Sequence, residues 1–419
     1  MLILNKDLIT KYLITLLPVT LVLSIFFTEL ILLIIMIFFF IDFFEEKKNY
    51  KNFFYIFLFL YVLYISISSV SFGQEQIFKS TFFYFRFLLY FFALVYYFRK
   101  IKIYNSLLKS FIFTASILII DGIIQFVLGF NVIGMPTVHS SRISSFFGEE
   151  LILGSYLVRL LPFFLIFFIF QFKNYKKIQL IFLLLLFFIV ILSGERTALF
   201  LLFLSFFIFF IFLKELRKLI LFSSIFFILI IATLTTFNKS YKERYIINFF
   251  DSFGVLNSDN QNKISLYDQN NEIRKIYIYS KQHEAHYLTA YKMFKDKYIF
   301  GHGPKSFRVL CKDERYKVSE IGCATHPHNI LMQFLSELGL FGFSFLLIFH
   351  ILLLNELVKI SQSKKNNDEK KILLFSIVGV IINIFPLIPS GNFFNNWLSI
   401  ILILNLVNYI YFRKKYLNA

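Results

Sequence analysis

Long apolar runs, separated by short polar patches, follow one another along most of the chain. Each run is about 15 to 25 residues long, and a bilayer core about 30 Å thick requires about 20 apolar residues as an α-helix. Because lipid offers the backbone no hydrogen-bond partner, such runs are expected to be helices. Runs such as Leu183–Leu192 lack the alternation of barrel strands. The pattern predicts an all-α, polytopic integral membrane protein.

The apolar runs predict about twelve transmembrane helices. They cover residues 12–28, 30–44, 53–71, 82–98, 111–131, 151–171, 179–193, 197–213, 219–237, 333–354, 372–389 and 396–412. Tight turns are expected between the first two runs and between the seventh and eighth.

The basic residues of the short connections predict the orientation of these helices. With the runs in this order, every strongly basic loop falls on one side, from Lys47–Lys51 to Arg413–Lys415. The alternate short loops hold little more than Lys79, Arg142 and Arg196. Short cytoplasmic loops carry the excess of Lys and Arg, so both termini are expected in the cytoplasm.

Composition agrees with this interpretation. The chain of 419 residues is 58% hydrophobic and 16% charged, whereas soluble domains average about 25% charged residues. Its net charge of +18 could indicate a nucleic-acid partner, but the one-sided placement in short loops explains that charge as a topology signal. No nucleic acid is needed.

One connection is far longer than the others. Residues 238–332 form a polar segment on the outer side, between a bundle of about nine helices at 1–237 and about three helices at 333–419. An amphipathic helix is expected at Lys281–Phe300. Both cysteines, Cys311 and Cys323, lie in this segment, either as a disulfide or as free thiols. Long ordered insertions are uncommon unless functional, so the chemistry is expected here.

The candidate base of this segment is His328. It stands in Thr325-His326-Pro327-His328-Asn329, where the chain returns to an apolar run, and Gly339 and Gly342 follow at fixed spacing. An imidazole titrates near neutral pH and can deprotonate a hydroxyl group. Without the motif, the alternative is that His328 is an ordinary polar residue at the start of a helix. No zinc-ligand spacing occurs among the histidines, so no metal is expected.

Three arginines are candidate anion-binding residues. Arg196 lies in a tight turn between two apolar runs, Arg142 in an outer loop, and Arg308 after the glycine-rich turn that begins at Gly301. A guanidinium matches phosphate oxygens in bidentate geometry. The alternatives are a salt bridge from Arg196 to Glu195 or a nearby carboxylate such as Glu149, and an ordinary loop role for Arg142.

Together these motifs resemble the O-antigen ligase and O-antigen polymerase superfamily. The resemblance rests on His328-Asn329, nine residues, Gly339, two residues and Gly342, and on the turn Gly301–Arg308. It extends to Arg142–Pro162 and Ser193–Thr197 and covers roughly residues 110 to 345. In that family a large periplasmic loop between the ninth and tenth of about twelve helices carries the catalytic His.

The resemblance implies a metal-independent, inverting glycosyltransferase of the bacterial inner membrane that needs no cofactor. Its donor would be a glycan on a polyprenyl carrier such as undecaprenyl diphosphate, and its acceptor a sugar on the lipid A core; a polymerase would use a second lipid-linked glycan. His328 would be the base, and Arg142, Arg196 and Arg308 would bind the diphosphate. His326 and Asn329 are candidates for holding that base in place. The His-Asn spacing favours the ligase.

Two other classes of protein remain open from the residues alone. One is a multi-span transporter or lipid flippase. Asp121, inside the fifth apolar run, is a candidate proton relay of a transporter, whereas a single such acid more often pairs with an Arg or caps a helix break, here near Gly122. Transporters commonly contain two related halves, and the chain has no such duplication. A membrane scaffold would bind partners through the outer segment, with His328 replaceable.

Overall fold

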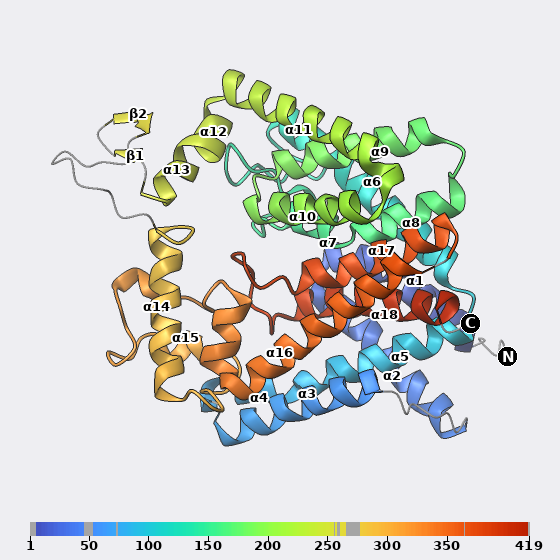
Figure 1. Cartoon of the computed structure of the whole chain (residues 1–419), viewed down its shortest axis with the longest axis horizontal. Helices are drawn as coiled ribbons and strands as arrows, with labels where there is room; N and C mark the ends of the chain where they lie inside the picture. The colour runs from blue at the N-terminus through green and yellow to red at the C-terminus, as the bar shows by residue number, and fades with distance from the viewer. Residues whose placement is uncertain are drawn as a thin grey trace.

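The computed structural model describes residues 6–45, 53–72, 74–254, 256–257, 260–264, 277–363 and 365–417. Within these residues the fold is helical, apart from connecting loops and a small antiparallel hairpin of β1 (Leu256–Asn257) and β2 (Asn260–Ile264). Most of the long helices lie side by side in one bundle, and α14 stands across the end opposite the C-terminal end of α18 (Figure 1).

Each of the twelve predicted runs overlaps a helix or, at α7 and α8, a bent pair of helices, but the first run crosses the break between α1 and α2 and the eleventh continues past the end of α17. The helices are α1 (Lys6–Leu23), α2 (Ile25–Glu45), α3 (Phe53–Ser71), α4 (Phe78–Phe82), α5 (Arg86–Lys100), α6 (Tyr104–Leu128), α7 (Leu153–Arg159), α8 (Leu161–Gln171), α9 (Lys176–Leu192), α10 (Arg196–Phe212), α11 (Arg217–Phe237), α12 (Lys239–Lys242), α13 (Asn248–Ser252), α14 (Lys281–Asp296), α15 (Phe307–Leu310), α16 (Ile330–Gln362), α17 (Asn367–Asn383) and α18 (Asn396–Tyr416).

Four of the described helices are long and apolar enough to cross a membrane, in α2, α6, α16 and a stretch that includes α11. The pair α7 and α8, bent by 50°, makes a fifth if it is one span. Two shorter apolar helices lie at Tyr55–Ser71 and Arg196–Phe212. A helical membrane protein fits these segments, whereas twelve crossings and the place of the long loop among them stay predictions.

The first tight turn lies earlier than predicted. The apolar pattern placed it near residue 29, but α1 ends at Leu23 and α2 begins at Ile25. The Ser24 hydroxyl accepts a hydrogen bond from the backbone N–H of Phe26, 3.2 Å away, so a side chain competes with the helix ladder at this point. Because apolar residues flank Ser24 on both sides, hydropathy alone carried the run through the break.

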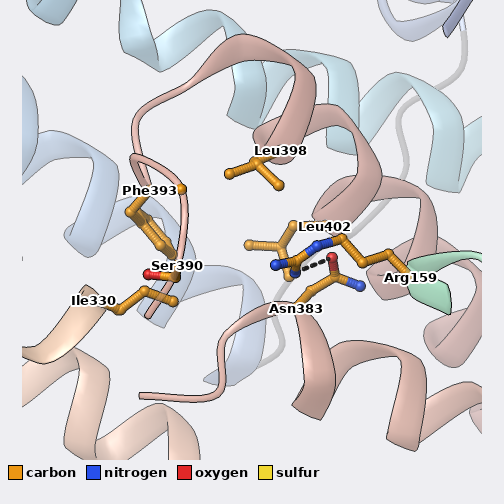
Figure 2. Close-up of a pocket in the computed structure, with 8 residues that line it drawn as sticks. Arg159, Ile330, Asn383, Ser390, Phe393, Leu398 and Leu402 are labelled. Atoms are coloured by element: carbon orange, nitrogen blue, oxygen red, sulfur yellow. Dashed lines mark hydrogen bonds between the residues drawn. The ribbon is translucent and has the colours of Figure 1, made fainter. Parts of the chain in front are cut away.

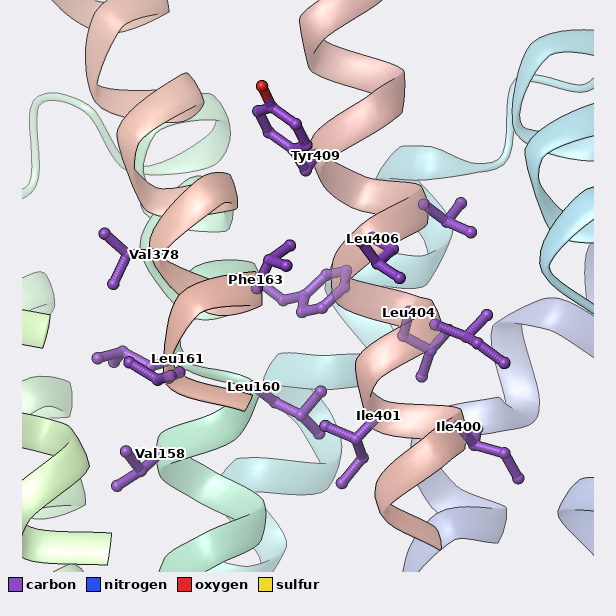
Figure 3. Packing of buried hydrophobic residues seen from close by; sticks show 14 of the residues in the cluster. Val158, Leu160, Leu161, Phe163, Val378, Ile400, Ile401, Leu404, Leu406 and Tyr409 are labelled. Carbon is purple, nitrogen blue, oxygen red and sulfur yellow. The ribbon is translucent and has the colours of Figure 1, made fainter. Parts of the chain in front are cut away.

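The core lies where α7 and α8 meet α17 and α18. Figure 3 shows Val158, Leu161 and Phe163 among side chains from α17 and α18, including Val378 and Ile401, and all of these are buried. On the outside of α11, by contrast, large apolar side chains such as Ile225 and Ile228 are 60% and 64% exposed. Apolar side chains on both the inner and outer faces of helices are what a bundle in lipid requires.

A kink in α16 is the place where the outer segment docks on the bundle. Gly339 has φ 64° and ψ −169°, a conformation open almost only to glycine. The N–H of Leu340 there donates to the carbonyl of Tyr298 at 2.8 Å. A Cβ on Gly339 would collide with the carbonyl of Ile299. The first glycine of the motif therefore lets two backbones come into contact.

Replacing Gly339 with alanine is expected to destabilise the protein by about 1–3 kcal/mol from backbone strain alone, with a further steric cost. The midpoint of thermal unfolding in detergent measures this change. Gly134→Ala is the matched control, because Gly134 also has a positive φ, 82°, but has nothing within 4 Å of an added Cβ. Equal shifts for the two variants would contradict a close backbone approach at Gly339.

Candidate functional site

A cavity of about 1420 Å³ brings together residues that are far apart in the sequence. Its lining comes from residues 21–25, 142–159, 195–200, 244–253, 279–283, 305–308, 325–328 and 388–398. Five predicted site residues line it, namely Arg142, Arg196, Arg308, His326 and His328. The sixth, Asn329, lies next to it and is described below.

The turn between α9 and α10 is held by hydrogen bonds to the carbonyl groups at the end of α9. Arg142 donates from Nε to the Ser193 carbonyl at 3.4 Å, and Arg244 donates from Nε and Nη2 to the Gly194 carbonyl at 3.0 and 2.9 Å. The hydroxyl of Tyr241 donates to Leu192 at 3.0 Å. Carbonyl groups at a helix C-terminus lack partners and carry partial negative charge. The arginines satisfy them and stay beside the cavity.

Arg196 begins α10 and lies against the segment that follows α11. Its Nη2 donates to the Arg244 carbonyl at 2.7 Å, and its guanidinium lies 5.5 Å from the ring centre of Phe249. Its Nε is buried with no hydrogen-bond partner among the described residues. Part of the guanidinium is therefore available to a ligand.

The salt bridge considered for Arg196 is not formed with Glu195. The Glu195 carboxylate instead accepts hydrogen bonds from the Gly154 N–H at 2.6 Å and from the Ser155 hydroxyl at 2.6 Å. These groups lie at the start of α7, where a helix N-terminus favours negative charge. Among the described residues, no ion pair joins Arg196 to Glu149 either. The buried charge of Arg196 has no acidic partner of its own.

Arg244 is a cation of this site that the sequence did not single out. It lies between Lys242 and Tyr245 at the start of the outer segment, so it looked like part of an ordinary basic run. Burial lowers the pKa of Arg244 and of Arg142, and the Arg244 charge lowers the pKa of Arg142 further. Cations close enough for one to lower the pKa of another favour an anion between them.

The loop from Ile384 to Asn395 makes hydrogen bonds that fix the segment carrying the predicted base. The His326 Nε2–H donates to the Ser390 carbonyl at 3.0 Å, so Nδ1 of the neutral ring accepts from the Thr325 hydroxyl at 2.9 Å. The Ser390 N–H donates to the His328 carbonyl at 2.8 Å. His328 has φ 57°, an uncommon conformation for this residue type. These bonds fix the backbone that presents the His328 ring.

Four imidazoles gather at this point. Ring centres of His326, His286 and His283 lie 4.0, 5.1 and 5.7 Å from that of His328. Burial, and then the neighbouring imidazoles, lower the pKa of His328 to about 3 and contribute to a pKa of about 4 for His326. Both rings are therefore neutral at neutral pH. The His328 ring makes no hydrogen bond within the described residues and can accept a proton from a ligand.

The described residues contain no group of three or more His, Cys, Asp or Glu side chains with the geometry to hold a metal ion. The two cysteines, Cys311 and Cys323, form a disulfide with a Cα–Cα distance of 5.0 Å. Cys311 also belongs to a small separate core with Met293 and Phe307. This core ties the turn before α15 to α14.

The turn from Gly301 to Arg308 is held by a buried carboxylate in α16. Glu337 accepts hydrogen bonds from the backbone N–H groups of Lys305 at 2.9 Å and Phe307 at 3.2 Å, and from Gln333 at 3.0 Å. The side chains of Lys305 and Arg308 line the cavity. Lys305 was not predicted, because one lysine in a glycine-rich turn carries no signal.

Asn329 positions the site rather than contacting the cavity. Its side-chain oxygen accepts from the Met332 N–H at 3.0 Å and so caps the start of α16. Its amide group donates to the carbonyls of Pro386 at 2.8 Å and Ile388 at 3.3 Å. One side chain thus joins the start of α16 to the loop that carries Ser390.

Asp121, considered as a proton relay, also serves the loop after α6. Its carboxylate accepts a hydrogen bond from the Val132 N–H at 2.9 Å and another from the Ser145 hydroxyl. Both donors belong to the segment between α6 and α7 that carries Arg142. These bonds give Asp121 a structural role in placing that segment.

A small pocket of about 10 Å³ contains a further arginine and shares lining residues with the larger cavity. Arg159, at the end of α7, is 5% exposed and donates from Nη1 to the Asn383 side-chain oxygen at 3.1 Å. Figure 2 shows its guanidinium beside Asn383, with Ser390 and Leu398 lining the same pocket. A lone Arg inside an apolar run is a signal of function, and the sequence analysis overlooked it.

The charged side chains that line the cavity are mostly cationic. Arg142, Arg159, Arg196, Arg244, Lys305 and Arg308 line it, against the carboxylates of Glu150 and Glu195. Placing six cations, two of them buried and four half-buried, beside two carboxylates is costly unless anions enter. The site therefore favours an anionic ligand next to a neutral imidazole.

The comparisons with known proteins agree with the motifs. The family model described as O-antigen ligase matches residues 181–347, a range that includes Arg196, Arg308 and His328. No curated protein matches the chain. The apolar helices and this family indicate a bacterial membrane protein with lipid-linked glycan substrates. Residues 181–347 are therefore similar to the O-antigen ligase family, and this match supports the resemblance to the O-antigen ligase and O-antigen polymerase superfamily.

Proposed function

We propose that the protein transfers a glycan from a polyprenyl-diphosphate carrier to an acceptor sugar, without a metal ion and with inversion at the anomeric carbon. The observation that carries this proposal is one cavity lined by a neutral imidazole, His328, and by six cationic side chains. The reaction takes place at the periplasmic face of the bacterial inner membrane, with both termini in the cytoplasm.

The diphosphate of the donor binds beside the α9–α10 turn. Arg142 and Arg196 are the predicted ligands, and Arg244 joins them through its contacts with the same turn. The diphosphate gains negative charge as it leaves, and guanidiniums fixed in a cavity stabilise that charge without rearrangement. Arg308 is the third predicted cation and lies with Lys305 on another part of the wall.

His328 activates the acceptor hydroxyl. The acceptor oxygen forms a bond to the anomeric carbon while the bond from that carbon to the diphosphate oxygen breaks, and the hydroxyl proton moves to the His328 ring. Burial makes this imidazole a weak base in the empty site. A bound anionic donor favours the protonated ring and raises its pKa, so the base becomes competent once the donor is in place.

The ligase reaction, with a lipid A core sugar as acceptor, is favoured by the His-Asn spacing, and the polymerase reaction is the second candidate. We propose three parts for the chain: a membrane bundle at residues 1–237, a periplasmic segment at 238–332 that carries the base, and membrane helices at 333–419. Asn329 and His326 hold His328 through the loop that contains Ser390.

Reconstitution in vesicles tests this function. The purified full-length protein receives a polyprenyl-diphosphate-linked glycan and a glycolipid acceptor, with divalent metal ions chelated. Transfer to the acceptor with an equal yield of free polyprenyl diphosphate, and an inverted anomeric linkage by NMR, is expected. Movement of the donor across the bilayer without any glycosidic bond would instead identify a flippase.

A further inference from the structure

Five of the six cations of the cavity fall into two groups on separate parts of the backbone, whereas Arg159, which donates to Asn383, belongs to neither. The α9–α10 group consists of Arg142, Arg196 and Arg244, whose guanidiniums all donate to backbone carbonyls of that turn or of its neighbour. The second group consists of Lys305, on the turn before α15, and Arg308, in α15 itself, and this turn depends on α16 for its position. In Figure 1, α10 and α15 lie well apart.

His283, His326 and His328 line the same cavity as both groups. After burial and the neighbouring His286, the charge of Arg196 is the next influence that lowers the pKa of His283. The charge of Arg308 also lowers the pKa of His326. The ring centres of these two histidines lie 5.7 and 4.0 Å from that of His328. The predicted base thus has a neighbouring histidine that each cationic group influences.

The second group has no anion of its own. Lys305 is 8% exposed, and its ammonium makes no hydrogen bond or ion pair among the described residues. The Nε of Arg308 is buried and equally without a partner there. Their nearest carboxylate, Glu337, is occupied by the backbone N–H groups of the turn. Burial lowers the pKa of Lys305 to about 8, although the charges of Glu337 and Glu29 act to raise it. A buried ammonium without a direct partner is costly, so this group favours an anionic ligand.

One diphosphate does not account for both groups. The three guanidiniums of the α9–α10 group already offset the charge of one diphosphate ester, and they are held by a different part of the backbone from Lys305. We propose that Lys305 and Arg308 bind a phosphoryl group of the acceptor, so that the acceptor is itself an anionic, phosphorylated lipid. This inference rests on the proposed glycosyl transfer.

The source of that phosphoryl group separates the two candidate reactions. A second polyprenyl-diphosphate-linked glycan would present the diphosphate of its carrier, whereas a glycolipid core would present phosphate esters on its sugars. Both sources offer the same oxygens to an ammonium and a guanidinium. The site is therefore expected to prefer an acceptor that carries a phosphoryl group. Whichever of the two candidate acceptors loses affinity when it is dephosphorylated identifies the reaction.

Binding of inorganic pyrophosphate tests the two groups without any glycan. Trp397 is the single tryptophan of the chain and lines the cavity, so its fluorescence reports binding in the full-length protein, and calorimetry gives the stoichiometry. Two equivalents are expected for the wild type. One is expected for Lys305→Gln/Arg308→Gln, and one for Arg142→Gln/Arg196→Gln. A single equivalent in the wild type, or the loss of the same equivalent in both double variants, would overturn the two-group assignment.

Transfer kinetics test the role of the second group with each candidate acceptor and its dephosphorylated form. Lys305→Gln is expected to raise KM for the phosphorylated acceptor by about 10- to 100-fold, as for a lost charge-assisted hydrogen bond. It should leave the KM for the donor and the KM for the dephosphorylated acceptor unchanged. Lys295→Gln, on the exposed face of α14, is the matched control and should change none of these values.

The outcomes separate the inference from the proposed function. Equal KM values of the wild type for phosphorylated and dephosphorylated acceptors would overturn the inference while leaving glycosyl transfer intact. Absence of any transfer by the wild type, together with two bound pyrophosphates, would refute the transfer reaction and not the second anion site. Loss of charge selection in Lys305→Gln supports both.

Discussion

Replacing His328 with alanine is expected to lower glycan transfer by at least about 100-fold, because a positioned general base contributes about 10²- to 10⁴-fold. The ring makes no hydrogen bond within the described residues, so its removal should leave folding and membrane insertion unchanged. The measurement is the initial rate of transfer in vesicles, normalised to the amount of correctly inserted protein.

The controls for His328 are other histidines of the chain. His139→Ala removes an exposed imidazole that does not line the cavity and should leave transfer unchanged. His326→Ala removes the bond to the Ser390 carbonyl and should lower transfer less than His328→Ala does. Wild-type rates in His328→Ala would mean that no base acts at this position.

The pH dependence of the wild type provides a separate prediction about the same ring. The acid limb of kcat/KM reports the base of the free enzyme, and burial lowers the pKa of His328 to about 3. Protonation inactivates a base, so activity is lost as pH falls through that pKa. The limb is therefore expected below pH 5, and a limb near 6.5, the value of an unburied imidazole, would contradict the burial of His328.

Run length predicted the helices better than it predicted their ends. An apolar run of about 20 residues has few structural options in lipid, and each run overlaps at least one helix in the structure. The break at Ser24 depends on one hydroxyl and the backbone N–H of Phe26. Hydropathy, which averages over many residues, does not detect such a local competition.

The candidate site was predictable where a motif marks it and not where contacts alone define it. His328 and Gly339 stand in a spaced pattern, and the φ of 64° at Gly339 explains why glycine is required there. Arg244 and Lys305 reach the cavity only because their segments fold onto the α9–α10 turn and onto Glu337. Contacts between residues that are tens of positions apart in the chain cannot be recognised from a single sequence.

Arg196→Gln is the second large-effect prediction and concerns the donor. Arg196 has a buried Nε without a partner in the described structure and no acidic residue paired with it, which leaves its charge for the diphosphate. A hydrogen bond to a charged group contributes about 1.5–3 kcal/mol, so donor kcat/KM is expected to fall by about 10- to 100-fold. Arg196→Lys should restore only part of this loss, because an ammonium cannot make the bidentate contact.

Arg217→Gln is the matched control for this prediction. Arg217 also lies at the start of a helix, α11, and also donates to backbone carbonyls, those of Phe210 and Ile211, but it does not line the cavity. Loss of a merely structural arginine would lower stability in both variants and leave donor kcat/KM of the folded protein alone. The donor role of the Arg196 guanidinium is supported if donor kcat/KM falls in Arg196→Gln, recovers partly in Arg196→Lys and does not fall in Arg217→Gln. Equal donor kcat/KM in Arg196→Gln and the wild type would remove Arg196 from the diphosphate site.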